Sequence, residues 1–464
     1  MSSTEQDIHP TMTHSTFLKT CKILKETLNM SNDRVIFSLC PDSSISSFTI
    51  NNLLGVFIGC PTNLFNISDF KNDPVDFLIG IQNLNVKEIY LPLSVLSTVL
   101  EKANQLLENN KKAGYQNTTK KNSNSTSLLR SDFLRNVQNL IIPFSGRPNS
   151  AMIEKLLKRY SNVMISTNQI CCTYEHKFNP IISMQTGIDT IPKYMYLDPT
   201  ALREGIIDEI SLTEVGSEGY IRIQDSGCVP YCTDVTIVNP ETEVPCIDGE
   251  YGEIWCCSEA NVYSYYLSDK KLRKDPFITS QFSSKLKGEA DKGLTYLRTG
   301  DFGFIKSVNF VDHNGVLNRK KLLFILGSMN ETVEILGLTH FVIDLEQTVK
   351  NVHSSISDCY IAKMGGLLVC LIRTRDRLLS KYANLCALIT SSLLDKHGVI
   401  LDMCAFVRVP KFNDSTSPAP PNWSKERLSL FKRWLQCELQ IDSQFGINYG
   451  ENISMYLLSE FENN

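Results

Sequence analysis

Between Thr13 and about Tyr160, apolar residues follow two patterns that alternate along the chain. Stretches in which apolar positions recur every three or four residues predict helices, and short continuous apolar runs predict buried strands. In chain order these are helix Phe17–Leu28, strand Val35–Leu39, helix Asp76–Leu84, strand Lys87–Leu91, helix Ile153–Tyr160 and strand Val163–Ile165. This alternation predicts a parallel sheet that is covered by helices.

One polar run interrupts this region. From Asn109 to Ser127 the sequence reads NNKKAGYQNTTKKNSNSTS and contains almost no apolar side chains that folding could bury. Such a composition predicts a disordered insertion, and a solvated loop is favoured over a binding role.

Beyond Arg203, short strands separated by turn residues replace the helices. The predicted strands are Tyr220–Ile223, Asp234–Val238, Glu253–Cys257, Thr295–Leu297 and Phe302–Ile305. This pattern predicts a compact β-rich subdomain.

From Gly327 onward, helical and strand patterns mix again. The predicted elements are a strand at Thr332–Leu336, helices near Val342–Val349 and Leu385–Asp395, and strands at Leu367–Ile372 and Cys404–Val409. The fold class is therefore α/β, with an α/β subdomain at 1–203, a β-rich subdomain at 204–326 and a small α+β lobe at 327–464.

Composition narrows the functional classes. The 464 residues are 42% apolar and 21% charged, with a net charge of −4, so a sizeable core is expected and a general attraction to nucleic acid is not. The polar stretch Met1–Pro10 shows no secretory signal, and no apolar run approaches the roughly 20 residues that cross a bilayer. We expect a cytoplasmic protein that makes at most a peripheral contact with an organelle membrane.

The 15 cysteines support the same compartment. They lie within apolar runs or as adjacent pairs such as Cys171-Cys172, which is typical of reduced, buried thiols. Cys228 and Cys232 have no second pair at zinc spacing, so no structural metal site is predicted.

Several motifs, taken in order, resemble those of fatty-acyl-AMP ligases in the adenylate-forming (AMP-dependent synthetase/ligase) superfamily. They are Asp198–Gly205 (DPTALREG), Asp225–Gly227 (DSG), Val235–Thr242 (VTIVNPET), Gly249–Trp255 (GEYGEIW), Tyr296–Phe304 (YLRTGDFGF) and Leu336–Glu346 (LGLTHFVIDLE). The regions Ile170–Arg203 and Val333–Glu346 most resemble the C-terminal ligase-like unit of the disco-interacting protein 2 family. That family carries tandem ligase-like units and is associated with diacylglycerol and fatty-acid metabolism.

The resemblance implies part of an adenylate-forming large domain followed by a small, mobile C-terminal lobe. In this family most of the first subdomain precedes the phosphate-binding loop, whereas Met1 falls at about that loop. We therefore expect an N-terminally truncated chain, or a missing sheet that is supplied in trans.

The resemblance also assigns nucleotide-binding roles. Such ligases join a carboxylate to the α-phosphate of ATP, and an acceptor-only carboxylate suits the ribose hydroxyls. Asp301 takes the ribose position, with Arg298 and Thr299 beside it, and Tyr174 takes the position of an aromatic residue that stacks on adenine. The alternative for Asp301 is an ordinary aspartate in an exposed turn.

Lys425 falls where the family places its catalytic lysine, whose long side chain suits a group carried by a rotating lobe. The flexible run Pro418–Pro421 just before it predicts a mobile loop. Ser424 replaces the usual glycine, so an ordinary surface lysine remains an equal alternative.

Three departures put ATP and magnesium in doubt, although the family implies ATP, AMP and Mg²⁺ as ligands. The phosphate-loop position, Ser2–Glu5, has no glycine, and Glu5 would repel polyphosphate. In the aromatic motif Glu175 replaces a glycine, and the magnesium-binding acid falls on Phe178 or Asn179. At the hinge, Gly327 is followed by Ser328–Glu331 in place of arginine and a lysine-aspartate pair.

Three functions remain open. The first is a catalytically degenerate ligase-like module in lipid metabolism that binds a fatty acyl group or acyl-adenylate. The second is an active ATP-dependent acyl-adenylate synthetase that uses Asp301 and Lys425. The third is a non-enzymatic scaffold that associates with an upstream ligase-like unit.

Overall fold

The computed structural model describes residues 8–41, 44–84, 86–116, 129–163, 165–186, 193–211, 219–267, 282–288, 293–311, 317–364, 366–374, 379–408 and 427–448. The chain forms two compact units, one of residues 1–195 and 222–326 and the other of residues 196–221 and 327–464. Across the described ranges, no helix is both long enough and apolar enough to cross a membrane.

A six-stranded sheet forms the centre of the first unit. Its order is β3 (Thr62–Leu64), β2 (Ile36–Ser38), β4 (Glu88–Tyr90), β5 (Asn139–Phe144), β6 (Ile170–His176) and β7 (Asn179–Met184). The first five strands are parallel and only β7 is antiparallel. The carboxyl ends of β2, β4, β5 and β6 therefore lie along the same edge.

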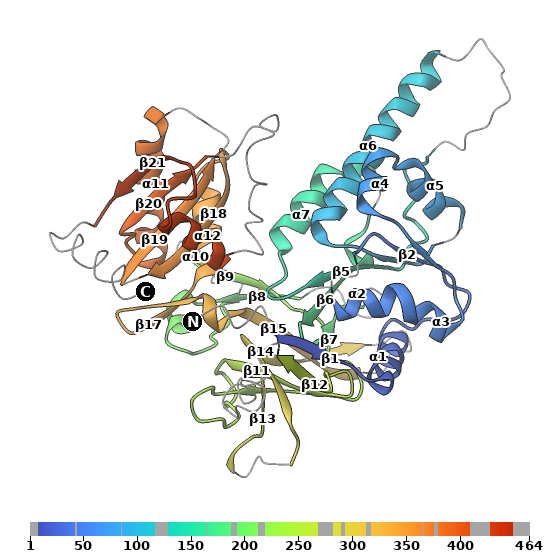
Figure 1. The fold of residues 1–464 in the computed structure, drawn as a ribbon, viewed down its shortest axis with the longest axis horizontal. Helices are drawn as coiled ribbons and strands as arrows, with labels where there is room; N and C mark the ends of the chain where they lie inside the picture. Colours follow the sequence, from blue (N-terminus) through green and yellow to red (C-terminus); the bar gives the residue numbers. More distant parts are fainter. Residues whose placement is uncertain are drawn as a thin grey trace. The chain divides into compact units, whose positions relative to one another are not determined.

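Helices cover both faces of this sheet, as the alternation in the sequence predicts (Figure 1). One face packs against α4 (Ile67–Asn72), α5 (Val75–Asn83), α6 (Leu93–Gln116) and α7 (Ser150–Arg159). The other packs against α1 (His14–Thr27) and a continuous helix made of α2 (Ile45–Phe48), a π-helical turn (Thr49–Leu54) and α3 (Gly55–Ile58). Neighbouring strand residues such as Leu140 and Ile141 enter opposite cores, because side chains alternate across a strand.

The β-rich part of the first unit is a second sheet. Its order is β10 (Thr233–Val238), β11 (Gly252–Ser258), β14 (Tyr296–Val311) and β13 (Ser283–Ser284), and β15 (Leu317–Ser328) also pairs with β14. Two-stranded ladders join β1 (Ile8–Thr11) to β12 (Ser264–Leu267) and β8 (Tyr194–Leu197) to β9 (Ile221–Gln224).

The strands predicted at Thr295–Leu297 and Phe302–Ile305 are one strand, β14. The prediction of two strands was wrong because the turn-like residues between them bulge out of β14 without ending it. Glu253 on β11 pairs with Phe302, whereas Trp255 pairs with Arg298, and the register shifts between these pairs.

Two other sequence predictions are corrected. Val163 lies in a 3-10 helix, Ser161–Val163, and is fully buried in the core without joining a sheet. The next strand begins only at Ile170. Helix α6 continues to Gln116, so the first part of the predicted disordered insertion is helical. Residues 117–128 lie outside the described ranges.

The second unit has its own sheet. Its order is β18 (Ile356–Met364), β19 (Leu367–Thr374), β20 (Met403–Val407) and β21 (Ile441–Gly446). Helices α10 (Val342–Val352) and α11 (Leu379–His397) pack on one face, and α12 (Arg427–Leu435) packs on the other. The unit also contains α8 (Pro199–Arg203) and a hairpin of β16 (Thr332–Ile335) and β17 (Leu338–Phe341).

Candidate functional site

The candidate site lies at the carboxyl edge of the six-stranded sheet. Tyr90 ends β4, and Phe144 at the end of β5 is the register partner of Tyr174 on β6. The last residues of β6 are Glu175 and His176. In sheets of parallel strands, ligands usually bind at this edge.

A hydrogen bond joins two of the predicted nucleotide-binding residues, which come from different sheets. The Tyr174 hydroxyl donates to Asp301 Oδ2 at 2.6 Å. Tyr174 is 1% exposed and Asp301 is 6% exposed. Burial, and next the Asp301 charge, raise the pKa of Tyr174 well above its ordinary value, so the hydroxyl keeps its proton. Stacking on a base would require the ring to become exposed, so that role stays a prediction.

The bulge in β14 holds Asp301 in place through Thr299. Thr299 Oγ1 donates to the Ile254 carbonyl at 2.8 Å and accepts from the Asp301 amide at 3.1 Å. Gly300, between them, has φ of 70°, a conformation that glycine adopts readily. The structure thus brings Tyr174, Thr299 and Asp301 together.

Arg298 is turned to a structural partner, Glu253 on β11. Arg298 Nη2 lies 2.7 Å from Glu253 Oε2, and Arg298 Nε lies 3.0 Å from the same oxygen. Glu253 also accepts from the Trp255 indole at 2.9 Å and from the Gly300 amide at 3.1 Å. Arg298 therefore supports the bulge through Glu253, and its predicted contact with a nucleotide stays a prediction.

Glu175 forms a second polar group at this edge. The Tyr90 hydroxyl donates to Glu175 Oε1 at 3.1 Å, and the Ser46 hydroxyl of α2, which donates to the Pro180 carbonyl at 3.2 Å, also interacts with the carboxyl group. The residue is half-buried, and burial raises the pKa of Glu175 from 4.5 to about 7, whereas the bonds from Ser46 and Tyr90 lower it. Burial lowers the pKa of the neighbouring His176 to about 4, so its imidazole is uncharged at neutral pH.

We expect Glu175 to make stability depend on pH. Because its pKa is raised on folding, its stabilising contribution is full below about pH 4.5 and is lost as the pH rises through about 7. In urea unfolding at pH 5, 6, 7 and 8, the stability difference between wild type and Glu175→Gln should shift in favour of the variant as the pH rises. Taking this difference removes the titration that both proteins share. A difference that stays constant over this range would contradict the raised pKa.

Phe178 and Asn179, the positions expected to hold a magnesium-binding acid, are buried in the protein interior. Phe178 is 3% exposed, and its ring lies 4.7 Å from that of Tyr265. Asn179 is fully buried and donates from Nδ2 to Asn261 Oδ1 at 2.6 Å. Within the described ranges, no cluster of three or more His, Cys, Asp or Glu side chains is arranged to hold a metal ion. A family-type magnesium site does not fit these residues.

Two parts of the prediction lie outside the described ranges, namely Lys425 and the phosphate-loop position Ser2–Glu5. The hinge position is described. The boundary between the two units falls after Leu326, and Gly327 has φ of 155°. A Cβ at Gly327 would lie 3.2 Å from Phe341 Cδ1, so a side chain would fit poorly there.

The sequence reasoning missed three residues of this site: Ser46, Tyr90 and Glu253. Glu253 lies in a recognised motif, but pairing with Arg298 depends on the register shift between β11 and β14. Tyr90 ends a predicted strand, which was the available signal, because polar residues at the carboxyl ends of parallel strands commonly meet.

Comparisons with known proteins are consistent with this geometry. The sequence profile described as "Disco-interacting protein 2-like, AMP domain" matches residues 330–444. The chain is 52% identical over 462 residues to the "Homeostatic regulator of DAG" of Saccharomyces cerevisiae, covering 98% of this chain and 28% of that protein. It is 24% identical to human "Disco-interacting protein 2 homolog B", covering 92% of this chain and 25% of that protein. The chain thus spans about a quarter of the length of these relatives.

Solved structures show the fold. A fatty acyl-adenylate ligase from L. pneumophila, in complex with acyl adenylate and pyrophosphate, matches with a TM-score of 0.53 at 16% identity, covering 95% of this chain and 69% of that one. A structure from a study of fatty acyl-adenylate ligases from E. coli and L. pneumophila matches with a TM-score of 0.64 at 13% identity, covering 92% of this chain and 67% of that one. The predicted α/β adenylate-forming fold is confirmed.

Proposed function

From the premise that this chain is a fatty-acyl-AMP ligase-like module related to the disco-interacting protein 2 family, we propose that it binds an acyl-adenylate or a similar ligand without forming acyl-adenylate from ATP. The position of Asp301 in the β14 bulge supports the binding of a ligand. The side chains Phe178 and Asn179, at the positions expected to bind magnesium, support the loss of turnover.

The observation that carries this proposal is the packing of Phe178 and Asn179. Adenylate formation needs the charge on the triphosphate to be neutralised as pyrophosphate leaves, and a magnesium ion held by a carboxylate usually does this. Phe178 offers no oxygen, and Asn179 uses its amide on Asn261 and on the Ile181 backbone. Neither side chain can turn to a metal without breaking the core around it.

Asp301 retains the chemistry for binding a sugar. An ionised carboxylate can accept about four hydrogen bonds, so ribose hydroxyls can be added to the bond from Tyr174. Thr299 fixes the backbone of the bulge, so the carboxylate keeps its position when a ligand arrives, but the side chains that cover it must move aside because Asp301 is only 6% exposed. Glu175 at the same edge would disfavour a polyphosphate once it ionises, whereas a single phosphoester carries less charge.

The name of the Saccharomyces cerevisiae relative supports a role in diacylglycerol homeostasis for the longer protein that contains such a module. We extend this to the present chain as part of the proposal, with a cytoplasmic location and an upstream ligase-like unit as a partner.

The test combines binding with turnover. We expect a non-hydrolysable acyl-adenylate to bind in isothermal titration, and Asp301→Ala to weaken its binding about tenfold or more, because a charge-assisted hydrogen bond contributes roughly 1.5–3 kcal/mol. Asp132→Ala, a change at an ion-paired surface residue, is the matched control and should bind as wild type does.

The turnover arm is magnesium-dependent exchange of pyrophosphate into ATP, which should stay at background. Robust exchange that is abolished by Lys425→Ala would contradict the proposal and establish an active synthetase. If Asp301→Ala binds the acyl-adenylate as tightly as wild type does, Asp301 does not bind the sugar.

A further inference from the structure

A cavity of about 450 Å³ lies in the first unit, apart from the Asp301 site. It is lined by the end of α1, the end of β7, residues 228–231, residues 233–235 of β10 and residues 319–321 of β15. Neither Tyr174 nor Asp301 lines this cavity, and Val235, which does, packs in one apolar cluster with Tyr174, Leu323 and Ile325. The volume is in the range of pockets that hold small organic ligands.

Strand β15 places two cations at the cavity, and two core residues follow them on the same face. Side chains two residues apart share a face of a strand, so Arg319, Lys321, Leu323 and Ile325 follow one another along the same face of β15. Leu323 and Ile325 are fully buried, whereas Arg319 and Lys321 are exposed. The two cations thus stand where the apolar surface ends.

The apolar floor of the cavity is formed by Met184, Val229 and Val235, and Val235 packs in one cluster with Leu323 and Ile325. Met184 is 1% exposed and Val235 is 6% exposed, so both present atoms that are well packed from behind. Because these side chains have little surface left to bury, an alkyl chain placed over them would gain mainly from the removal of its own methylene groups from water.

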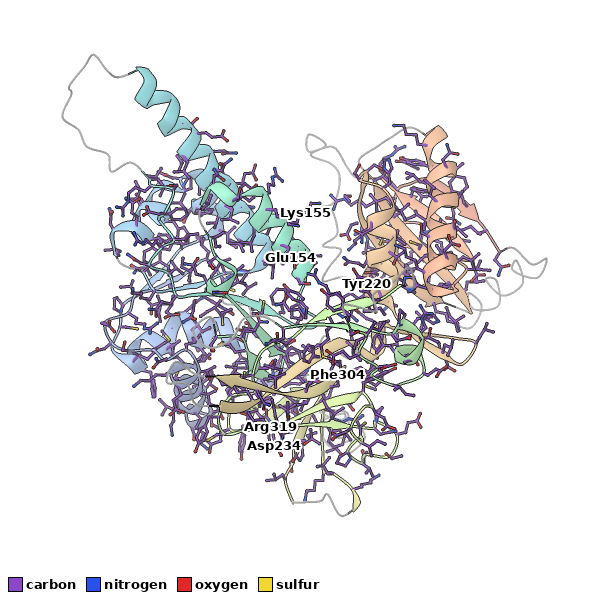
Figure 2. All side chains as sticks on the ribbon, turned by 180° about the vertical axis from the view of Figure 1, so that it is seen from behind. Glu154, Lys155, Tyr220, Asp234, Phe304 and Arg319 are labelled. Carbon is purple, nitrogen blue, oxygen red and sulfur yellow. The ribbon has the colours of Figure 1, made fainter. Side chains whose placement is uncertain are left out.

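Arg319 and Lys321 have charge available for a ligand. Among the residues that the structure describes, neither forms an ion pair. Figure 2 shows Arg319 and Asp234 in the same region of the unit, but Asp234 Oδ2 accepts from the Tyr296 hydroxyl at 2.8 Å. A guanidinium and an ammonium two residues apart can hold different oxygens of one phosphate.

The acidic lining restricts the ligand further. Glu26 at the end of α1 and Asp234 also border the cavity, and both disfavour a ligand whose negative charge is spread over its length. Carboxylates accept hydrogen bonds, so they suit a ligand with hydroxyl groups beside a single anionic group.

We propose that this cavity binds a phosphate monoester amphiphile, with its phosphate on Arg319 and Lys321, hydroxyl groups near Glu26 and Asp234, and its alkyl chain over Met184, Val229 and Val235. A lysophospholipid headgroup and a soluble sugar phosphate share the phosphate and hydroxyl chemistry. The apolar floor favours the lipid.

The probes are hexanoyl lysophosphatidic acid, sn-glycerol 3-phosphate and inorganic phosphate, each titrated into the full chain by calorimetry. We expect the hexanoyl compound to bind about tenfold or more tightly than glycerol 3-phosphate, because the chain buries several methylene groups. The double variant Arg319→Gln/Lys321→Gln should bind the hexanoyl compound about tenfold or more weakly than wild type does.

Lys155→Gln with Lys158→Gln is the matched control, because these cations on α7 are exposed and do not line the cavity. This variant should bind as wild type does. Thermal melting of both variants checks folding, which exposed positions should preserve. If wild type and Arg319→Gln/Lys321→Gln bind the hexanoyl compound with equal affinity, the phosphate does not bind at Arg319 and Lys321. If wild type binds the hexanoyl compound and glycerol 3-phosphate with equal affinity, the ligand is not an amphiphile.

Discussion

Gly227→Ala is expected to destabilise the first unit by about 4 kcal/mol or more, enough to prevent stable folding. Gly227 has φ of 95°, and a Cβ there would lie 2.1 Å from the Met184 carbonyl carbon and 2.2 Å from the Gln185 nitrogen. These atoms belong to the backbone at the end of β7, so they cannot move aside without disturbing the sheet. The measurement is the free energy of unfolding in urea, together with the yield of soluble protein.

Gly249→Ala is the control for this experiment. Gly249 has nearly the same φ, 96°, but a Cβ there would meet no atom within 4 Å. Its cost should be the backbone strain alone, about 1–2 kcal/mol. Similar losses in the two variants would show that the close approach of the Gly227 turn to β7 is not what requires glycine.

Glu253→Ala is expected to lower the free energy of unfolding by about 3–5 kcal/mol, because it removes one partner of a buried ion pair. Glu253 is 2% exposed and accepts from Arg298, the Trp255 indole and the Gly300 amide. After the change, the longer contact of 3.9 Å to Glu243 remains for Arg298. Urea unfolding measures the loss.

Glu250→Ala is the matched control, since Glu250 is an exposed carboxylate three residues earlier, and it should change stability by at most about 0.5 kcal/mol. The stability loss in Glu253→Gln should lie between those of Glu253→Ala and Glu250→Ala. The amide can still accept hydrogen bonds from Trp255 and Gly300, but the charge is lost. Wild-type stability in Glu253→Ala would mean that the bulge does not depend on this carboxylate.

Part of the main sheet and its helices, namely β2, β4, α1, α5 and α7, could be predicted because burial gives their apolar residues a periodic pattern in the sequence, whereas β3, β5, β6, β7 and α6 were not predicted. The strands around Phe37 and Ile89 are short apolar runs, and the helices that cover them repeat every three or four residues. Val163 shows the limit of this reasoning. An apolar run records burial, and a 3-10 helix can bury Val163 as fully as a strand can.

The site was predictable only in part. Motif resemblance singled out Tyr174 and Asp301, although they are far apart in the chain, but their mutual hydrogen bond depends on how two sheets pack. The sequence shows that Glu175 departs from its motif. Its hydrogen bond to Tyr90 could be predicted only from the strand order β4-β5-β6. Residues that form hydrogen bonds between different strands have no fixed separation in the sequence, so a sequence pattern cannot identify them.

Because residues 196–221 belong to the second unit, the chain passes between the units three times. A polypeptide that starts at Gly327 would lack α8 and the bond from Arg203 Nη2 to the Lys396 carbonyl at 3.0 Å. One proteolytic cut after Leu326 would likewise leave a piece of the smaller unit on the larger fragment. A single break in the chain therefore cannot yield the two units as separate, complete polypeptides.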